Sequence, residues 1–430
     1  MDASGAVARG ARMKSLRRVG ILGALFLGCG AQPHSPFINS PPGYPHLPHF
    51  KGGPFPPSSN FIPSLEVPGS NVMKIQVGRG QVCGRPGYIN ELCTEITLCL
   101  PGTDDCETIP DVLVDTGSVG LRLFSSTLHL RYPEVTNAQG TPLAECAQFG
   151  SGTDWGPLAV ADIVMADQKA KNATIQVINA RYATLPSICL ESDPEPRKAG
   201  FNGILGVGLF KEDCGSICET EQTPTLYFAC SGLDCTQTPL SRSSQVKNPI
   251  SLLAKNNNGI VIALPSIGPE GSERVIGSLI LGVHTQANNT PGQVKVFHTD
   301  QQGNFVTEFE GKILDGSFID SGTNTLLFPN LVGLTACDQV GVAPGFYCPA
   351  GALTFSANMI ALSNGEKTAV PFVIENAQSL VAQKRSAFFN IGAHSQKMFD
   401  WGLPFFYGKV LYEVIENEET PFGKGPYWAF

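Results

Sequence analysis

Two short runs of the chain carry residues that could do acid–base chemistry. Each reads Asp, Ser or Thr, Gly, then Ser or Thr, and each follows an apolar, strand-like approach: Asp115-Thr116-Gly117-Ser118 and Asp320-Ser321-Gly322-Thr323. Because the runs lie in different halves of the chain, only a fold built from two similar halves would bring them together. Two carboxylates held in one site cannot both ionise near neutrality, so one stays an acid while the other acts as a base. Such a pair can activate a water molecule against a peptide carbonyl.

Either run alone is also a common turn sequence, since Asp caps its own backbone and Gly permits positive φ. The presence of two such runs favours a catalytic site over ordinary turns, because both runs continue with apolar residues. These are Leu121, Leu123 and Phe124, and Leu326, Leu327 and Phe328. If both runs were only turns, the chain would be a structural lipoprotein of the cell envelope.

The composition predicts a β-rich protein of two domains. The 430 residues are 42% hydrophobic and 15% charged, with 47 Gly and 33 Pro. The net charge is −8, and no cluster of Lys and Arg follows the N-terminal segment, which argues against nucleic-acid binding. No apolar run reaches the roughly 18 residues expected of a membrane-spanning helix.

The N-terminus has the pattern of an export signal. Basic residues precede a short apolar stretch from Val19 to Leu27, which ends in Phe26-Leu27-Gly28-Cys29. This ending resembles a bacterial lipobox, so we expect residues 1–28 to be a lipoprotein signal peptide and Cys29 to be lipidated. The chain would then be anchored in the bacterial envelope, in the periplasm or at the outer membrane. An ordinary secretory signal with an incidental Cys is the alternative.

The segment 29–68 is rich in Pro, Gly, Ser and His and predicts an extended linker; an inhibitory propeptide stays open. Short apolar strands separated by turns follow from Asn71. The expected strands are Val72–Val77, Glu95–Leu100, Val112–Val114, Leu158–Val164, Ile175–Val177, Gly259–Leu264, Ser278–Val283, Val294–Phe297, Phe305–Phe309, Phe318–Ile319 and Val410–Ile415. Helices are expected at Asn248–Lys255 and Ile374–Arg385.

The cysteines suit an oxidising compartment. Removing Cys29 from the 13 cysteines leaves 12, which is compatible with six disulfides. Cys99 with Cys106, and Cys337 with Cys348, make plausible local pairs. The polar segment 214–244 looks like an insertion with its own bridges. Zinc is the alternative for its four cysteines, Cys214, Cys218, Cys230 and Cys235.

Read in order, the motifs resemble those of the pepsin-like aspartic peptidases over roughly residues 70–430, in an exported bacterial branch known as domains of unknown function. Besides the two Asp motifs, the matching segments are the flap Phe149-Gly150-Ser151-Gly152, then Phe201–Gly206, Ser278–Gly282 and Trp401-Gly402. The resemblance implies an all-β, bilobal fold with an active-site cleft between two similar lobes. We place the N-terminal lobe at 69–257 and the C-terminal lobe at 258–430.

The resemblance also implies roles. Asp115 and Asp320 would share a proton and hold the attacking water, while Gly117 and Gly322 allow close approach. Ser118 and Thr323 would donate hydrogen bonds to the carboxylates. The flap would close over a peptide or protein substrate. No cofactor and no metal are implied, and we expect a monomer.

Three positions depart from the family pattern. Phe149 replaces the usual flap Tyr, and Arg122 stands where the family often has Trp. Asp400 stands where an apolar residue is expected. Arg122 near the dyad would favour ionised carboxylates or recognise an acidic substrate group; a surface Arg is the alternative. These departures keep a second function open, a non-catalytic envelope lipoprotein that binds peptides by strand pairing.

Overall fold

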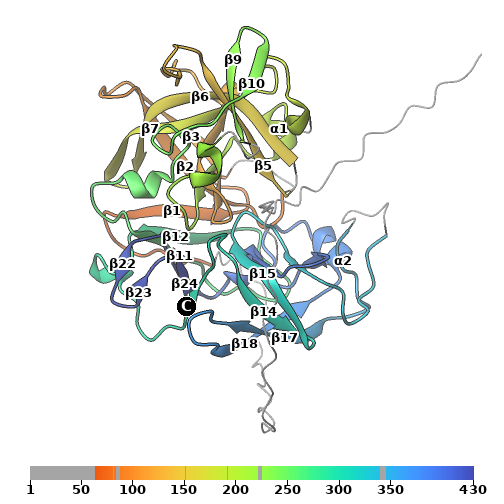
Figure 1. Cartoon of the computed structure of the whole chain (residues 1–430). Coiled ribbons are helices and arrows are strands. Elements are labelled where there is room, and N and C mark those ends of the chain that lie inside the picture. The colour runs from red at the N-terminus through yellow and green to blue at the C-terminus, as the bar shows by residue number, and fades with distance from the viewer. Residues whose placement is uncertain are drawn as a thin grey trace, which may run out of the picture.

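The computed structural model describes residues 63–80, 82–83, 88–150, 152–190, 192–220, 225–338 and 345–430. The predicted signal peptide, Cys29 and nearly all of the linker lie outside these residues. The regular secondary structure of the described part is mostly strand (Figure 1). Among the described residues, no helix is both long and apolar enough to cross a membrane.

The strands of the first half are β1 Val72–Val77, β2 Leu92–Cys99, β3 Cys106–Asp115, β4 Val119–Phe124, β5 Leu143–Phe149, β6 Gly152–Met165, β7 Gln168–Ile178, β8 Gly203–Val207, β9 Tyr227–Ser231 and β10 Asp234–Gln237. Those of the second half are β11 Gly259–Ala263, β12 Val275–Leu281, β13 Val296–His298, β14 Phe305–Phe309, β15 Lys312–Asp320, β16 Leu326–Phe328, β17 Leu353–Ile360, β18 Lys367–Ile374, β19 Gly392–His394, β20 Asp400–Gly402, β21 Val410–Val414, β22 Glu419–Thr420, β23 Gly423–Lys424 and β24 Tyr427–Ala429. The α-helices are α1 Pro196–Ala199 and α2 Ala377–Ala382.

The strands form two large sheets. The first has the order β10-β9-β5-β6-β7-β4-β8-β3-β2-β1-β12-β11-β21-β24-β13, and the second has the order β18-β17-β14-β15-β20-β16-β19. In Figure 1 the strands β2 to β10 make the upper half, and β14, β15, β17 and β18 lie in the lower half. β1 pairs along its length with β12 at the level where the halves meet.

The same four-strand arrangement occurs once in each half. In the first half β3 runs parallel to β8, β8 is antiparallel to β4, and β4 is parallel to β7. In the second half β15 is parallel to β20, β20 is antiparallel to β16, and β16 is parallel to β19. Each motif aspartate ends the first strand of its set, opposite a glycine: Asp115 pairs with Gly206 and Asp320 with Gly402. This repeat confirms the expected all-β fold with two similar lobes.

The approaches to the two motifs are apolar because these strands are covered on both faces. Val112, Leu113 and Val114 are completely buried in β3, and Ile319 is buried in β15. Beside β15, aromatic side chains pack edge-to-face or stacked, with Phe399 and Trp401 stacked at 4.1 Å between ring centroids. This cluster anchors the strand that presents Asp320.

Several predicted elements have the predicted bounds, and two predicted helices are shorter. β1 and β14 match their expected ranges residue for residue. Asn248 caps only a 3₁₀ turn, Pro249–Leu252, by accepting from Ile250 N–H. The helix expected from Ile374 reduces to α2, because Ile374 ends β18 and Asn376 caps the helix after it. The lobe boundary at residue 257 stays a prediction.

Six disulfides join the 12 described cysteines, as the count predicted. The pairs are Cys83–Cys93, Cys99–Cys106, Cys146–Cys189, Cys214–Cys218, Cys230–Cys235 and Cys337–Cys348. Both expected local pairs are confirmed, and the insertion 214–244 holds two bridges of its own. The zinc alternative for this insertion is wrong, because all four sulfur atoms are bonded in disulfides.

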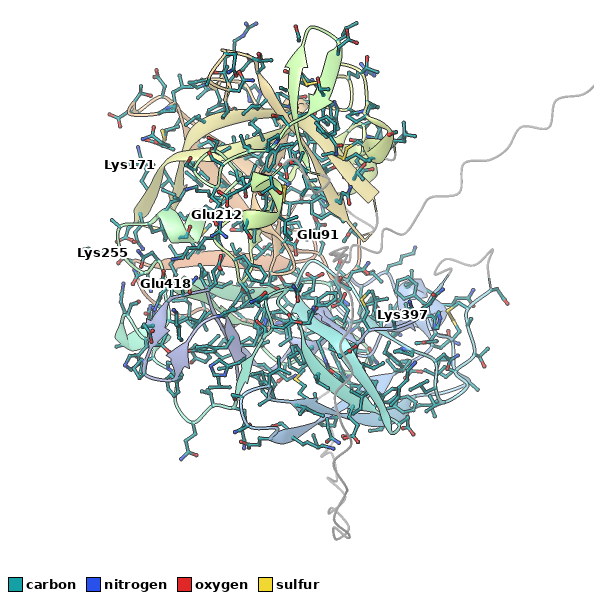
Figure 2. The ribbon with its side chains drawn as sticks, viewed as in Figure 1. Glu91, Lys171, Glu212, Lys255, Lys397 and Glu418 are labelled. Atoms are coloured by element: carbon teal, nitrogen blue, oxygen red, sulfur yellow. A yellow bond between two sulfur atoms is a disulfide. The ribbon has the colours of Figure 1, made fainter. Side chains whose placement is uncertain are left out.

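Polar contacts join the two lobes along one side. Lys211 Nζ lies 2.6 Å from Glu418 Oε1, and the Lys211 N–H donates to Glu416 Oε1 at 3.0 Å. Figure 2 shows Glu212 and Glu418 on this side, near the level where the halves meet.

Candidate active site

The two motif aspartates are held in the same way. Asp115 Oδ1 accepts from Gly117 N–H at 2.8 Å, and its Oδ2 accepts from the Ser118 hydroxyl at 2.5 Å. Asp320 Oδ1 accepts from Gly322 N–H at 2.7 Å, and its Oδ2 accepts from the Thr323 hydroxyl at 2.7 Å. The predicted donor roles of Ser118 and Thr323 are confirmed. In each motif the Asp side chain caps its own turn, which fixes the orientation of the carboxylate plane.

The two carboxyl groups face each other across the junction of the lobes. A Cβ added to Gly117 would lie 2.6 Å from Cγ of Asp320, and one added to Gly322 would lie 2.6 Å from Oδ1 of Asp115. The glycine of each motif thus lies against the aspartate of the other. The close approach predicted for these glycines is confirmed, and any larger residue would push the carboxylates apart.

The surroundings of the dyad favour a protonated carboxyl. Asp115 is 3% exposed and Asp320 is 2% exposed. Burial, together with the charge of Asp115 and a hydrogen bond to it, raises the pKa of Asp320 well above its usual range. The hydrogen bond from Thr323 opposes this shift. These contributions favour the protonated form of one carboxyl of the pair, which is the state a shared-proton dyad needs.

The second residue of each motif, Thr116 or Ser321, makes hydrogen bonds between the lobes. Thr116 N–H donates to the Ser321 hydroxyl at 3.1 Å, and Ser321 N–H donates to the Thr116 hydroxyl at 2.9 Å. The Ser321 hydroxyl in turn donates to Val114 O at 2.7 Å. The motifs predict Thr116 and Ser321 in the turns, but no local sequence pattern indicates these reciprocal bonds.

The predicted flap is a β-hairpin of β5 and β6. Phe149 and Gly152 face each other at its end, on either side of Gly150 and Ser151; Ser151 lies outside the described residues. Phe149 packs beside a buried cluster that includes Phe124, Phe201 and Ile204. The hairpin is therefore present where the resemblance placed it, with an apolar ring near its tip.

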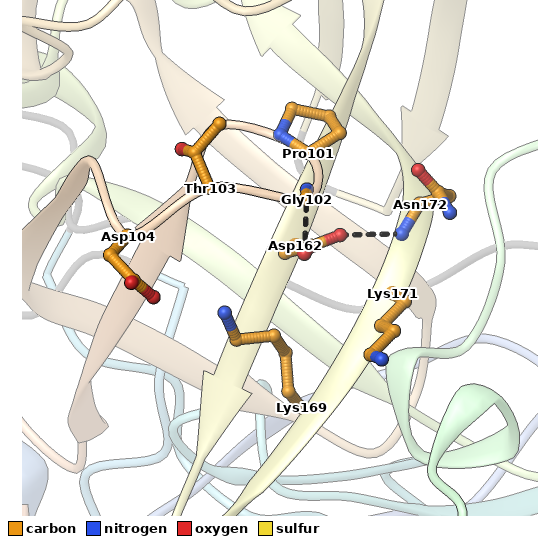
Figure 3. A pocket seen from close by; sticks show the side chains of 8 residues that line it. All are labelled: Pro101, Gly102, Thr103, Asp104, Asp162, Lys169, Lys171 and Asn172. Carbon is orange, nitrogen blue, oxygen red and sulfur yellow. Dashed lines mark hydrogen bonds between the residues drawn. The ribbon is translucent and has the colours of Figure 1, made fainter.

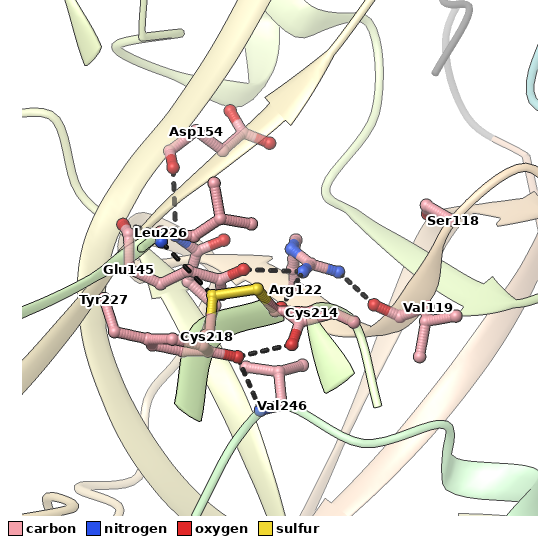
Figure 4. Close-up of polar contacts among 12 residues, drawn as sticks. Ser118, Val119, Arg122, Glu145, Asp154, Cys214, Cys218, Leu226, Tyr227 and Val246 are labelled. Carbon is pink, nitrogen blue, oxygen red and sulfur yellow. Dashed lines mark hydrogen bonds and ion pairs between the residues drawn. A yellow bond between two sulfur atoms is a disulfide. The ribbon is translucent and has the colours of Figure 1, made fainter. Parts of the chain in front are cut away.

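Arg122 is buried and ion-paired. Its Nη2 lies 2.8 Å from Glu145 Oε1 and 3.0 Å from Asp213 Oδ2, and the side chain is 3% exposed (Figure 4). The surface alternative for Arg122 is wrong. Since the guanidinium is enclosed and neutralised by two acidic side chains, recognition of an acidic substrate group is also wrong. Burial opposes its charge, but Glu145 and Asp213 outweigh burial and raise the pKa of Arg122.

Asp400 is a third buried carboxyl beside the dyad. It pairs in register with Phe318 on β15 and is fully buried. Burial raises its pKa well above the usual range, and the charge of Asp115 adds to this shift against a hydrogen bond from Thr323. Asp400 in turn helps to raise the pKa of Asp320.

Tyr88 lies near the dyad, although no sequence motif predicted it there. Its ring packs on Gly200, where an added Cβ would lie 2.6 Å from ring Cδ2. Its hydroxyl is buried and has no hydrogen-bond partner among the described residues. Burial, followed by the charges of Glu91, Asp115 and Asp320, raises the pKa of Tyr88.

Other polar groupings are separate from the dyad. A pocket of about 310 Å³ is lined by Asp162, Lys169 and Lys171, among others, and by neither Asp115 nor Asp320 (Figure 3). Asp162 accepts there from Gly102 N–H and Asn172 N–H. Glu91, Cys93 and Asp111 lie close together, but the sulfur of Cys93 is bonded to Cys83 and so cannot ligate a metal.

Comparisons with known proteins give a family and a structural neighbour. The model of the DUF3443 family, described as a protein of unknown function, matches residues 68–430. Among solved structures, the chain is similar to the crystal structure of an aspartic proteinase from Irpex lacteus. The identity is 14%, the match covers 83% of this chain and 96% of that chain, and the TM-score is 0.48. No curated protein matches the sequence. A likeness at this level carries no argument about chemistry, so the case for the site rests on its own residues.

Proposed function

We propose that this chain, which belongs to the DUF3443 family, is an aspartic endopeptidase that hydrolyses peptide bonds with a water molecule activated between Asp115 and Asp320. The observation that carries the proposal is the facing pair of carboxylates, each capped by its own motif and each in contact with the glycine of the other. Two unrelated turns would not need such a symmetric arrangement. Two facing carboxyl groups, in contrast, are suited to hold one proton and one water molecule between them.

In this reaction the ionised carboxylate removes a proton from the water as the water oxygen attacks the peptide carbonyl carbon. The protonated carboxyl gives its proton to the carbonyl oxygen, which leaves a tetrahedral intermediate with two hydroxyls. As the C–N bond breaks, the proton taken from water goes to the leaving amine, and one hydroxyl of the intermediate returns its proton to the dyad. Burial and the charge of Asp115 raise the pKa of Asp320, which supports one proton shared by the coupled pair before attack. No cofactor enters this scheme, because two carboxyls and water balance every proton.

The substrate is a peptide or protein, received by the flap hairpin ending at Phe149. Because Phe149 lacks a hydroxyl, its side chain contributes only apolar contact. We expect the enzyme to act as a monomer, since both aspartates belong to one chain.

The envelope location is a further part of the proposal. Six disulfides suit an exported protein. The lipobox-like ending at Cys29 supports a lipid tether in the bacterial envelope. Metabolic labelling with a radioactive fatty acid tests this: label should enter the wild type and not Cys29→Ser, and equal labelling of both would reject Cys29 as the anchor.

Cleavage of an unbiased peptide mixture by the oxidised protein, from pH 3 to pH 8, tests the activity. We expect cleavage that a transition-state-mimicking aspartic-peptidase inhibitor blocks, and that falls by about 10³-fold or more in Asp115→Asn and in Asp320→Asn. Both variants keep the shape of the side chain, and circular dichroism and thermal unfolding check that they fold. Cleavage retained in either folded variant would reject the dyad. Peptide binding without cleavage by the wild type would instead support the non-catalytic envelope protein.

A further inference from the structure

The guanidinium of Arg122 contacts parts of the chain that are distant in sequence. It comes from β4, which begins directly after the first Asp motif. Its Nη1 donates to Val119 O, and its Nη2 bonds to Glu145 on β5 and to Asp213, which precedes the Cys-bearing insertion. Figure 4 shows Val119 and Glu145 on two sides of the guanidinium. A single buried side chain therefore joins the active-site turn, the flap strand and the insertion.

The link to the flap has two points of contact. Glu145 precedes Phe149 by four residues on β5, so strand periodicity puts both side chains on the same face. Glu145 holds the guanidinium, and the ring of Phe149 lies over it, with 5.8 Å between Cζ and the ring centroid. The base of this strand is fixed again by Gln176, whose Nε2 donates to Glu145 O at 2.9 Å.

The link to the dyad runs through the backbone after the motif. Val119, whose carbonyl accepts from Arg122, follows Ser118, whose hydroxyl donates to Asp115 Oδ2. Gly120 has a φ of 98°, and an added Cβ would meet Val246 Cγ1 at 2.1 Å. Val246 N–H donates to Tyr227 Oη, which also bonds to Asp213. The segment after the motif is therefore enclosed by partners of the Arg122 cluster.

Burying a charged cluster of this kind costs free energy that apolar packing would not cost. Taking a guanidinium and two acidic groups out of water costs several kcal/mol per ion, and an apolar replacement of similar shape is often as stable. Stability is therefore a weak reason for it. A planar guanidinium can, however, hold two carboxylates, a carbonyl and a ring in one fixed geometry.

We propose that Arg122 is a positioning residue, which couples the flap hairpin to the active-site turn through Glu145, Val119 and the ring of Phe149. The two departures from the expected pattern, Arg122 and Phe149, are then one feature, a cation held against the flap ring. The inference deepens the proposed function and rests on it for its catalytic consequence, but the mechanical coupling can be measured without any cleavage.

Amide hydrogen exchange of the hairpin, at the described residues 145–150 and 152–155, tests the coupling directly. Phe149→Leu removes the ring face and should speed exchange there about two- to fivefold. Arg122→Lys keeps the charge but loses the planar fork, and should speed exchange about tenfold or more. If the two residues act as one unit, the double variant should exchange no faster than Arg122→Lys alone. Phe149→Tyr keeps the ring and should retain wild-type protection.

Arg181→Lys, at an exposed Arg, is the matched control and should change nothing. Exchange in β17 and β18, in the other lobe, should stay at the wild-type rate in every variant. If Arg122→Lys does not fold, Phe149→Leu compared with Phe149→Tyr still decides the issue. Unchanged hairpin exchange in Phe149→Leu, or effects that multiply in the double variant, would overturn the coupling.

Kinetics separate positioning from a purely structural role. Phe149→Leu should raise KM with kcat within about twofold of wild type, since Phe149 belongs to the flap and not to the turn that carries Asp115. Arg122→Lys should change both KM and kcat, because Arg122 also touches the turn that carries Asp115. An Arg122→Lys protein with a lower Tm but wild-type kcat and KM would contradict the positioning role. Absence of all cleavage in the wild type would reject the proposed function and leave the exchange result standing.

Discussion

Thr116 and Ser321 each donate their main-chain N–H to the hydroxyl of the other, at 3.1 and 2.9 Å. These bonds join the two lobes beside Asp115 and Asp320, at a buried place: Thr116 is 4% exposed and Ser321 is fully buried. The separation of Asp115 and Asp320 is therefore set by hydrogen bonds between their immediate neighbours. The lobes cannot move apart at the dyad without breaking these hydrogen bonds.

Removing one hydroxyl of this pair should destabilise the protein. In Thr116→Val the buried N–H of Ser321 loses its acceptor, which costs about 1–3 kcal/mol. Chemical denaturation measures this loss, and Ser321→Ala should act similarly, with a double variant less destabilised than the sum of the two. Thr97→Val is the matched control, because Thr97 makes its hydroxyl bond to Thr108 at an exposed site and should cost less than about 0.5 kcal/mol. Equal costs at the buried and exposed sites would contradict the importance of the junction.

A methyl group on Gly117 should damage catalysis more than folding. The added Cβ would lie 2.6 Å from Cγ of Asp320, so the carboxylate or the turn must shift. A misplacement of about 1 Å can cost about 10²-fold in rate, and we expect kcat for peptide cleavage to fall by that order in Gly117→Ala. Gly316→Ala is the control on β15, since its Cβ would meet nothing within 4 Å. Wild-type kcat in a folded Gly117→Ala would show that the two turns are farther apart during catalysis.

Asp154 should make stability depend on pH. Burial, with a further contribution from the charge of Asp193, raises the pKa of Asp154 in the folded protein to about 8. In the unfolded chain this pKa is about 3.9. The folded protein thus keeps a proton that the unfolded chain releases, so the stabilising effect is complete below about pH 4 and is lost as the pH rises toward 8.

Asp154→Asn should remove this dependence. The free energy of unfolding of the wild type should fall relative to that of the variant by up to several kcal/mol between pH 4 and pH 8. Denaturant titrations at several pH values in this window measure the difference, with Asp234→Asn on β10 as an exposed control. A difference between wild type and Asp154→Asn that stays constant with pH would show that Asp154 is ionised in the folded state.

Local patterns predicted the parts of the site that lie within one segment, and missed those that depend on pairing between segments. The Asp motifs, their Ser118 and Thr323 donors and the strands β1 and β14 follow from short-range rules of turns and alternation. The ion pairs of Arg122 do not, because Glu145 and Asp213 reach it only after β5 and the insertion fold around β4. A buried Arg and an exposed Arg look the same in sequence.

The same limit explains the shortened helix near Ile374. Apolar residues there have helical spacing, yet Ile374 is bonded into β18, and the helix begins only after Asn376. Pairing with β17 over eight residues outweighs a weak local helix preference. Tyr88 was missed for a related reason, since its contact with Gly200 joins two loops that no pattern connects.

The disulfides that close longer loops should stabilise the protein more. Cys146–Cys189 spans 43 residues and joins the flap strand β5 to the segment after β7, whereas Cys214–Cys218 spans only four. Because a longer loop loses more entropy when it is closed in the unfolded chain, replacing both cysteines by Ala should cost about 4 kcal/mol for the first pair and about 2 kcal/mol for the second. Denaturant unfolding of the two double variants, with the remaining bridges intact, measures the order. The reverse order would mean that Cys214–Cys218 stabilises the folded state, by holding Asp213 against Arg122. The variant without this bridge should then show faster hydrogen exchange in the flap hairpin.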